Sequence, residues 1–122
     1  MTTDDRVELR GLRVLARVGV PPEERRRPQP LEVDLDVHID LSAAGRSDDL
    51  NDTVDYGGIC SAAERAVAAA PAALLEHLAE RVSDAVLAAD DRVQEVAVAV
   101  RKVRPPVASH LATAGVSLRR RR

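Results

Sequence analysis

The strict alternation of residues 31–41 constrains the fold more than any other feature of this sequence. Six apolar residues occupy the odd positions from Leu31 to Leu41, and four acids and His38 occupy the even positions between them. A two-residue period is typical of a β-strand that buries one face. The acidic face with His38 could hold a metal ion, but alternation alone already produces a solvated face, which is the interpretation we favour.

Residues 6–20 predict a second strand with one irregularity. Apolar residues fall on odd positions before Gly11 and on even positions after it. One extra residue at a β-bulge exchanges the two faces of a strand in this way, so we place a bulge at Gly11. The stretch 19–22 (GVPP) ends the strand, and residues 23–30 read as a charged loop. We expect the two strands to pair antiparallel across that loop.

The rest of the chain predicts helices and then strands again. Residues 42–52 read as a polar loop, a helix runs from Tyr56 until Pro71 stops it, and residues 75–86 form a second amphipathic helix. Residues 93–103 predict a strand, and residues 116–118 a short one. The run 119–122, four arginines, reads as a solubilising and poorly ordered terminus, with an anion-binding tail as the alternative.

The order ββααββ predicts an α+β fold in a single domain, residues 1–122. Two helices cover only one face of a four-stranded antiparallel sheet. The other face mixes Leu15 and Arg17 with Ala97 and Ala99, which favours an assembly over a monomer. The chain has no Phe and no Trp, so its core must consist of Val, Leu and Ala, and a core of that kind often needs a subunit interface.

Composition excludes several classes of protein. A single cysteine, Cys60, forms neither an internal disulfide nor a cysteine-based metal site. No apolar run reaches the roughly 20 residues that cross a bilayer. Residues 1–5 (MTTDD) end in two aspartates and lack the basic and then apolar pattern of a signal peptide, so we expect a cytoplasmic protein. The net charge of −2 gives no basic field for nucleic acid.

Lys102 is the first candidate for chemistry. Of 18 lysines and arginines it is the one lysine. An amine can be tuned to give up its proton, whereas a guanidinium stays charged. Lys102 continues the apolar face of Val96, Val98 and Val100 at its rim, where partial burial disfavours a charged amine. A lysine with a buried stem and a solvated head is the alternative; we favour a general acid/base.

Three other residues are weaker candidates. Tyr56, the one aromatic residue, stands where a loop meets a helix and could stack on a flat ligand or simply pack there. Glu76, in the first turn of the second helix, could accept two N–H donors from an amino-pyrimidine edge or be an ordinary surface carboxylate. Glu23 or Glu24 could hold the amine of Lys102 if the fold brings them together.

Taken together, these residues resemble the dihydroneopterin aldolases of folate biosynthesis over nearly the whole chain. The matching stretches are residues 9–14 (LRGLRV), 19–26 (GVPPEERR), 48–57 (DDLNDTVDYG), 74–81 (LLEHLAER) and 100–106 (VRKVRPP), followed by Gly115 and Val116. The resemblance implies the T-fold, in which sheets of ββααββ subunits join into a tetrameric barrel. Two such rings usually stack into an octamer, and each site lies between subunits.

The resemblance also implies a reaction and its residues. 7,8-Dihydroneopterin undergoes retro-aldol cleavage to 6-hydroxymethyl-7,8-dihydropterin and glycolaldehyde, without metal, cofactor or Schiff base, because the pterin ring is the electron sink. Lys102 would be the general acid/base, acting through water, and Glu24 would position it. Tyr56 of the neighbouring chain would assist proton transfer. The carboxylate of Glu76 would bind the 2-amino and N3 edge of the pterin.

The Leu75 backbone and the segment Thr53–Val54 are implied beside that pterin edge. One departure from the family is plain: many members carry Tyr-His where this chain has Arg17 and Val18. Two alternatives therefore stay open, a dihydroneopterin-type side-chain epimerase and a non-catalytic T-fold scaffold that binds pterins or nothing. No nucleic acid or membrane partner is implied.

Overall fold

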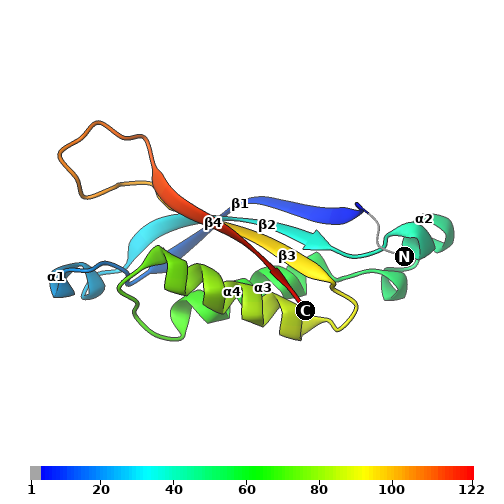
Figure 1. The fold of residues 1–122 in the computed structure, drawn as a ribbon. Helices are drawn as coiled ribbons and strands as arrows, with labels where there is room; N and C mark the ends of the chain where they lie inside the picture. Colours follow the sequence, from blue (N-terminus) through cyan, green and yellow to red (C-terminus); the bar gives the residue numbers. More distant parts are fainter. Residues whose placement is uncertain (1–3) are drawn as a thin grey trace.

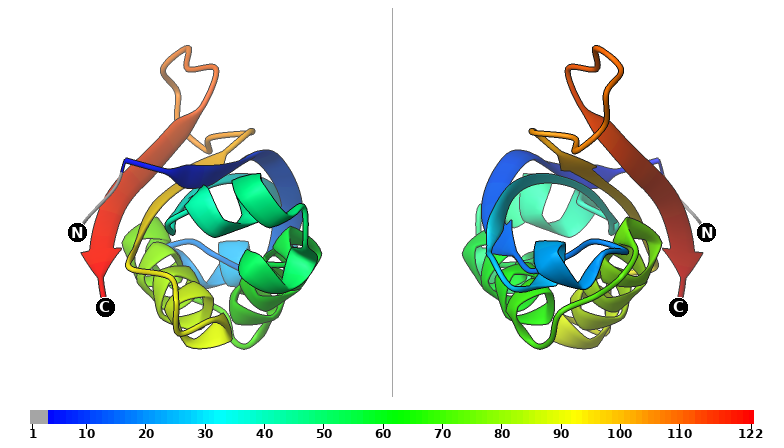
Figure 2. Two further views of the ribbon diagram at one scale, coloured as in Figure 1. Left: turned by 90° about the vertical axis from the view of Figure 1, so that its right-hand side faces the viewer. Right: turned by 90° about the vertical axis from the view of Figure 1, so that its left-hand side faces the viewer.

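The computed structural model describes residues 4–122, and its four strands form one antiparallel sheet in the order β1-β2-β3-β4. The strands are β1 (Arg6–Ala16), β2 (Gln29–His38), β3 (Glu95–Lys102) and β4 (Ala114–Arg121). The long helices are α3 (Tyr56–Ala68) and α4 (Leu75–Ala89). Both lie against one face of the curved sheet and leave the other face open (Figures 1 and 2). The predicted ββααββ order is confirmed.

The first three residues of the acidic start lie outside the described part of the chain. Within residues 4–122, no helix has the length and apolar character that a membrane span needs.

The core lies between the helices and the sheet. Val, Leu and Ala supply nearly all of it, with Ile39 and Ile59, as the absence of Phe and Trp predicts. The odd positions of β2 are fully buried from Leu31 to Val37, and Val96, Val98 and Val100 of β3 are buried beside them. Each fully buried Val or Leu contributes about 1.5–3 kcal/mol of transfer free energy. The buried apolar faces of α3 and α4 pack over these residues.

The predicted bulge in β1 is confirmed at Gly11. The register between β1 and β2 shifts between Leu9 and Leu12, and Gly11 has a φ of 69°. Only glycine adopts this conformation without steric cost, and its N–H donates to Asp34 Oδ1 at 2.7 Å. The strand ends earlier than predicted, at Ala16, because the chain then leaves the sheet and Val18 forms a parallel bridge with Ala72.

Two predicted loops contain short helices, and these predictions were wrong. The charged loop 23–30 holds α1 (Pro22–Arg25) and the first residues of β2. The polar loop 42–52 holds α2 (Ser42–Ser47) and the 3₁₀ turn η1 (Leu50–Asp52). None of the three has a buried residue, so no hydrophobic period marks them in the sequence.

The prediction of a poorly ordered arginine terminus was also wrong. Strand β4 runs to Arg121, and its arginines are paired on both faces. Arg119 and Arg121 reach Glu95 on the open face at 3.3 and 3.0 Å. Arg120 points the other way and binds Glu80 of α4 at 2.8 Å. Acidic partners on neighbouring elements, far away in the sequence, thus turn the arginine run into a strand.

The open face of the sheet is a network of ion pairs rather than a simple solvated surface. Arg10 binds Asp36 at 2.7 Å, and Arg101 bridges Asp34 at 2.7 Å and Glu32 at 3.1 Å. His38 lies on this face with Nε2 at 3.8 Å from Glu95 Oε2. The described residues contain no group of three or more His, Cys, Asp or Glu side chains suited to hold a metal ion.

Candidate functional site

Lys102 stands at the end of β3, where the strand's buried face reaches the edge of the core. Its backbone pairs with Leu31 of β2 and Ala114 of β4. The side chain is 12% exposed, as its place after three buried valines predicts. Its Nζ donates to Glu24 Oε2 at 3.1 Å. The one lysine of the chain is therefore a nearly buried amine with an acidic partner 78 residues away in the sequence.

Glu24 reaches Lys102 from the short helix α1. Pro22 begins that helix, and the two glutamates of its first turn suit the N-terminal end of the helix dipole. Arg25 Nη1 donates to the carbonyls of Gly19 and Val20 at 2.7 and 2.8 Å, which closes the turn on itself. A helix of four residues is too short to show an apolar stripe, so the sequence predicts a charged loop here instead.

Glu76 and Leu75 lie in the first turn of α4. Glu76 is exposed and Leu75 half-buried, and Leu74 precedes the helix without a side-chain cap. The segment before α4 is bound to the tail of β1: Ala72 N–H donates to Arg17 O and Gly19 N–H donates to Ala72 O, both at 3.0 Å. Gly19 also begins the turn that carries Glu24. Glu24 and Glu76 therefore belong to segments that are hydrogen-bonded to each other.

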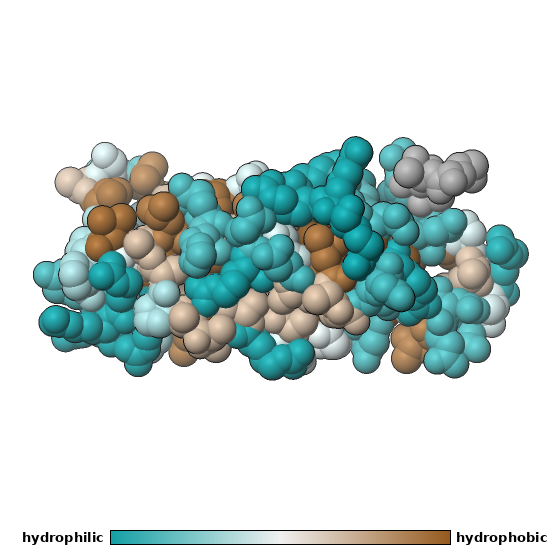
Figure 3. Space-filling model, turned by 60° about the horizontal axis from the view of Figure 1, so that its bottom comes forward, coloured by the Kyte–Doolittle hydropathy of each residue, from teal (hydrophilic) through white to brown (hydrophobic). Residues whose placement is uncertain are grey.

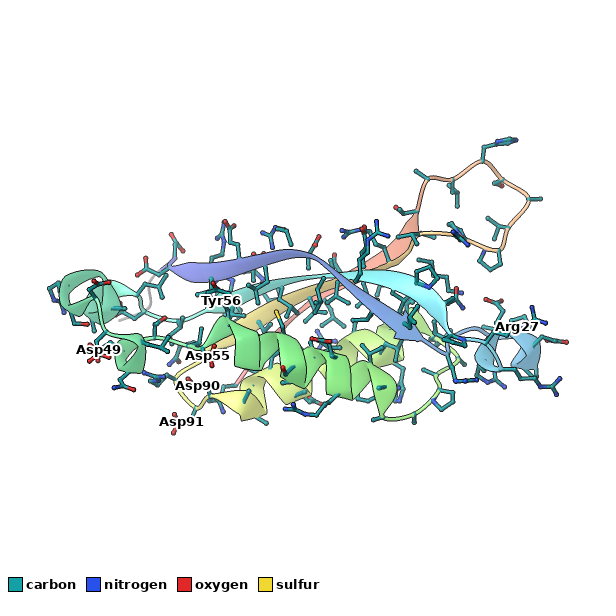
Figure 4. All side chains as sticks on the ribbon, turned by 180° about the vertical axis from the view of Figure 1, so that it is seen from behind. Arg27, Asp49, Asp55, Tyr56, Asp90 and Asp91 are labelled. Atoms are coloured by element: carbon teal, nitrogen blue, oxygen red, sulfur yellow. The ribbon has the colours of Figure 1, made fainter. Side chains whose placement is uncertain are left out.

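Tyr56, Thr53 and Val54 lie at the opposite end of the molecule. Arg92, three residues before β3, donates to Thr53 O at 2.8 Å, so this segment lies beside the start of β3, whereas Lys102 is its last residue. At about 3.3 Å per residue the two ends of β3 are about 23 Å apart. Figure 4 shows Tyr56 at the start of α3, in the half of the molecule away from Arg27, which follows α1 at the opposite end.

The seven predicted site residues therefore divide into two groups. In one chain Lys102 and Glu24 are hydrogen-bonded and Leu75 and Glu76 follow the segment bound to Gly19, whereas Thr53, Val54 and Tyr56 lie apart from them. Tyr56 is 64% exposed, Thr53 is half-buried and Val54 is buried. The expectation that Thr53–Val54 lies beside Glu76 does not hold within a single chain. Both groups can line one pocket only if they come from two chains.

Hydrophobic residues are exposed beside both groups. Near Lys102, the exposed apolar residues include Val20 and Leu74, and Figure 3 shows hydrophobic residues gathered at the end of the molecule that carries α1 and the loop 103–113. At the other end Leu50 and Tyr56 are both 64% exposed. Two hollows, of about 540 and 1270 Å³, lie on the open face and beside α2, and neither is lined by Lys102, Glu24 or Glu76.

The positions that depart from the family pattern have structural roles here. Arg17 is exposed and its Nη1 donates to Arg26 O, which ties the end of the α1 turn to β1. Val18 is fully buried, and its carbonyl accepts from Gln29 Nε2 at 2.6 Å. Sequence reasoning missed Arg25, Gln29 and the Val18–Ala72 bridge, because these contacts join segments whose sequences carry no local signal of them.

Comparison with known proteins gives a consistent result. The family model described as FolB, dihydroneopterin aldolase, matches residues 7–119. A dihydroneopterin aldolase of Staphylococcus epidermidis is 35% identical over 115 residues, which cover 94% of this chain and 95% of the relative. The Bacillus subtilis enzyme is 34% identical over 118 residues, 97% of this chain and 98% of its own. The crystal structure of E. coli dihydroneopterin aldolase in complex with neopterin superimposes with a TM-score of 0.86, at 30% identity, covering 95% and 98% of the two chains.

Proposed function

Because this chain belongs to the dihydroneopterin aldolase family, we propose that its active site combines Lys102, Glu24 and Glu76 of one chain with Tyr56 of a neighbour. The protein is a lyase of folate biosynthesis that acts on dihydroneopterin. The observation that carries the assignment of roles is the ion pair of the one lysine with Glu24, at 3.1 Å and nearly buried.

Lys102 moves the protons in this proposal. Cleavage of the side-chain carbon–carbon bond needs a base at the departing hydroxyl and an acid at the enamine carbon that remains. The hydroxyl proton leaves through Lys102 and a water, glycolaldehyde departs, and the bond electrons enter the pterin ring. The enamine carbon then takes up a proton and becomes the hydroxymethyl group. No metal or cofactor enters these steps, and Glu24 holds the amine in place.

Glu76 binds the pterin ring. A carboxylate facing two parallel N–H donors makes a short and strong charge-assisted pair of hydrogen bonds, which also fixes the orientation of the ring. The exposed Glu76 at the first turn of α4 is free to face the 2-amino and N3 groups, and the backbone of Leu75 lies beside it. The E. coli relative has been crystallised with neopterin, which supports a pterin as the ligand.

Thr53, Val54 and Tyr56 complete the site from a second chain. Strands β1 and β4 are the two edges of the sheet, and pairing the β1 edge of one chain with the β4 edge of the next closes the sheets into a barrel. Closed barrels stagger neighbouring strands, which moves one end of a chain toward the other end of its neighbour.

We propose that four chains form a ring and that two rings stack into an octamer. We also propose a cytoplasmic location, which suits an enzyme with one unpaired cysteine.

Replacement of Lys102 by arginine tests its role. Arginine keeps the positive charge beside Glu24 but does not give up a proton at any working pH. We expect Lys102→Arg to lower kcat by about 10²–10⁴-fold, with binding of neopterin nearly unchanged. Exposed Arg104→Lys on the following loop is the control. Normal turnover of the Lys102→Arg protein would exclude the acid/base role.

Product analysis separates the remaining alternatives. Purified protein is incubated with 7,8-dihydroneopterin and a chelator, and glycolaldehyde with 6-hydroxymethyl-7,8-dihydropterin is the expected result. A side-chain epimer alone would point to an epimerase and to the altered positions Arg17 and Val18.

Glu76→Gln should weaken neopterin binding at least tenfold, because an amide cannot accept both N–H groups. Binding as tight as in the unchanged protein would refute the role of Glu76.

A further inference from the structure

Gly19 is the residue against which the Glu24 side chain lies. A Cβ built on Gly19 would be 2.4 Å from Glu24 Cβ, 2.6 Å from its Cδ and 2.7 Å from Oε2. Heavy atoms do not approach so closely, so any other residue at this position must displace Glu24. The displaced atom Oε2 is the one that accepts the hydrogen bond from Lys102. The absence of a side chain at Gly19 is thus a condition for the Lys102–Glu24 pair.

The backbone of Gly19 is held from both sides, so it cannot simply move away from an added methyl group. Its N–H donates to Ala72 O at 3.0 Å, and its carbonyl accepts from Arg25 at 2.7 Å. Gly19 itself is buried, and the adjoining Val18 and Ala72 are 0% and 5% exposed. Because Gly19 has a φ of 157°, a larger residue strains the backbone there as well, and the remaining strain falls on the Glu24 side chain and its turn.

We propose that Gly19 is a positioning residue for the reaction: it touches no substrate, and it sets the place of the Glu24 carboxylate and through it the amine of Lys102. The proposal rests on the roles assigned to Lys102 and Glu24 above. Glu76 follows Ala72 in the chain, and none of its atoms is among the nearest neighbours of a Cβ built on Gly19. Catalysis and pterin binding therefore respond differently to a change at this glycine.

Gly19→Ala tests the proposal, with Gly45→Ala as the control for adding a methyl group at an open position without a positive φ. A Cβ on Gly45 has no atom within 4 Å, so the same methyl group is harmless there. We expect Gly19→Ala to lower kcat about 10- to 100-fold, since small misplacements of catalytic groups have effects of this size. Its Kd for neopterin stays within about twofold of the unchanged protein. An unchanged kcat, or an equal loss in Gly45→Ala, would overturn the proposal.

A double-mutant cycle separates positioning from general damage. In the Glu24→Gln background the ion pair is already lost, so Gly19→Ala should lower kcat by less than about threefold further. The same loss in both backgrounds would mean that Gly19 acts on the fold and not through Glu24. Glu24→Gln by itself tests the proposed function separately: if it retains full kcat, the assigned role of Glu24 fails whatever Gly19→Ala does.

Arg25→Met provides the test should Gly19→Ala not fold. It removes the donor to the carbonyls of Gly19 and Val20 and adds no atom near Glu24. We expect kcat to fall about three- to tenfold, with the loss again absent in the Glu24→Gln background. Arg27→Met, an exposed arginine two residues further along, is the control and keeps kcat. Equal kcat in the two variants would contradict the proposal.

Discussion

Asp34 shows how single residues of the open face hold several strands together. Its carboxylate accepts from Arg101 Nη1 of β3 at 2.7 Å and from the Gly11 N–H of β1 at 2.7 Å. The hydrogen bonds from Arg101 and then from Gly11 hold the pKa of Asp34 below its usual value. This one side chain therefore links the bulge in β1 to the strand that ends in Lys102.

A lowered pKa makes the contribution of Asp34 depend on pH. A carboxyl with a depressed folded-state pKa stabilises the protein above its unfolded value of about 4, and this stability is lost as the pH falls through the folded value. Asp34→Asn should lower the free energy of unfolding by about 1–2 kcal/mol at pH 7. The deficit relative to the unchanged protein should shrink below about pH 4.

Urea unfolding at pH 7 and pH 3, at one protein concentration, measures both values. Glu64→Gln, at an exposed position of α3, is the control and should change stability little at either pH. A deficit of the same size at both pH values would mean that the charge of Asp34 is not what stabilises the protein.

Candidate site residues could be picked out from the sequence where composition was extreme. One lysine among many arginines and one tyrosine without other aromatics single themselves out in the sequence. Their partners were not predictable in the same way. Residue types alone offered Glu23 and Glu24 as equivalent neighbours for Lys102, whereas the family resemblance named Glu24. In the structure it is Glu24 that accepts the hydrogen bond from the amine.

At the scale of elements, β1 and its bulge were predictable because the alternation of apolar residues changes phase at Gly11. The change of phase at Gly11 is a property of the whole strand, since each apolar residue after it must face the same core as those before it. The short helices α1 and α2 bury nothing, so their sequences carry no such record. The prediction of a poorly ordered terminus at residues 119–122 was wrong because Glu95 and Glu80, on other elements, pair with the arginines of β4.

Gly11→Ala tests the bulge. A Cβ on Gly11 would meet no atom within 4 Å, so the cost is conformational alone, from a φ of 69°. We expect the free energy of unfolding to fall by about 1–2 kcal/mol. Gly45→Ala, within α2 and equally free of contacts, should be neutral or slightly stabilising. Equal effects of the two substitutions in thermal unfolding would show that the bulge does not require glycine.

At the scale of the whole molecule, a site divided between chains predicts complementation. Lys102→Ala and Tyr56→Ala should each be nearly inactive alone. When the two proteins are unfolded together and refolded as mixed rings, a site that pairs an intact Lys102 with an intact Tyr56 arises in about a quarter of positions. We expect activity near that fraction of the unchanged protein.

A mixture of Lys102→Ala with Glu76→Gln provides the control for complementation. Both residues lie in the same group of one chain, so no mixed site is complete and activity should stay low. Recovery in this control, or none in the first mixture, would contradict the division of the site between two chains.

The sequence by itself determined the order of strands and helices, the buried face of the main strands and long helices, the bulge, and the one lysine proposed as the acid/base. These follow from period, phase and composition, which act along the chain. The tertiary structure decided that a four-residue turn brings Glu24 to Lys102, that the arginine run becomes a strand, and that Thr53 lies beside Arg92, before the start of β3, whereas Lys102 is at the end of that strand, about 23 Å further on. Such outcomes depend on contacts between segments far apart in the sequence, for which no local pattern exists. The same separation is the reason that we propose a site completed by a second chain.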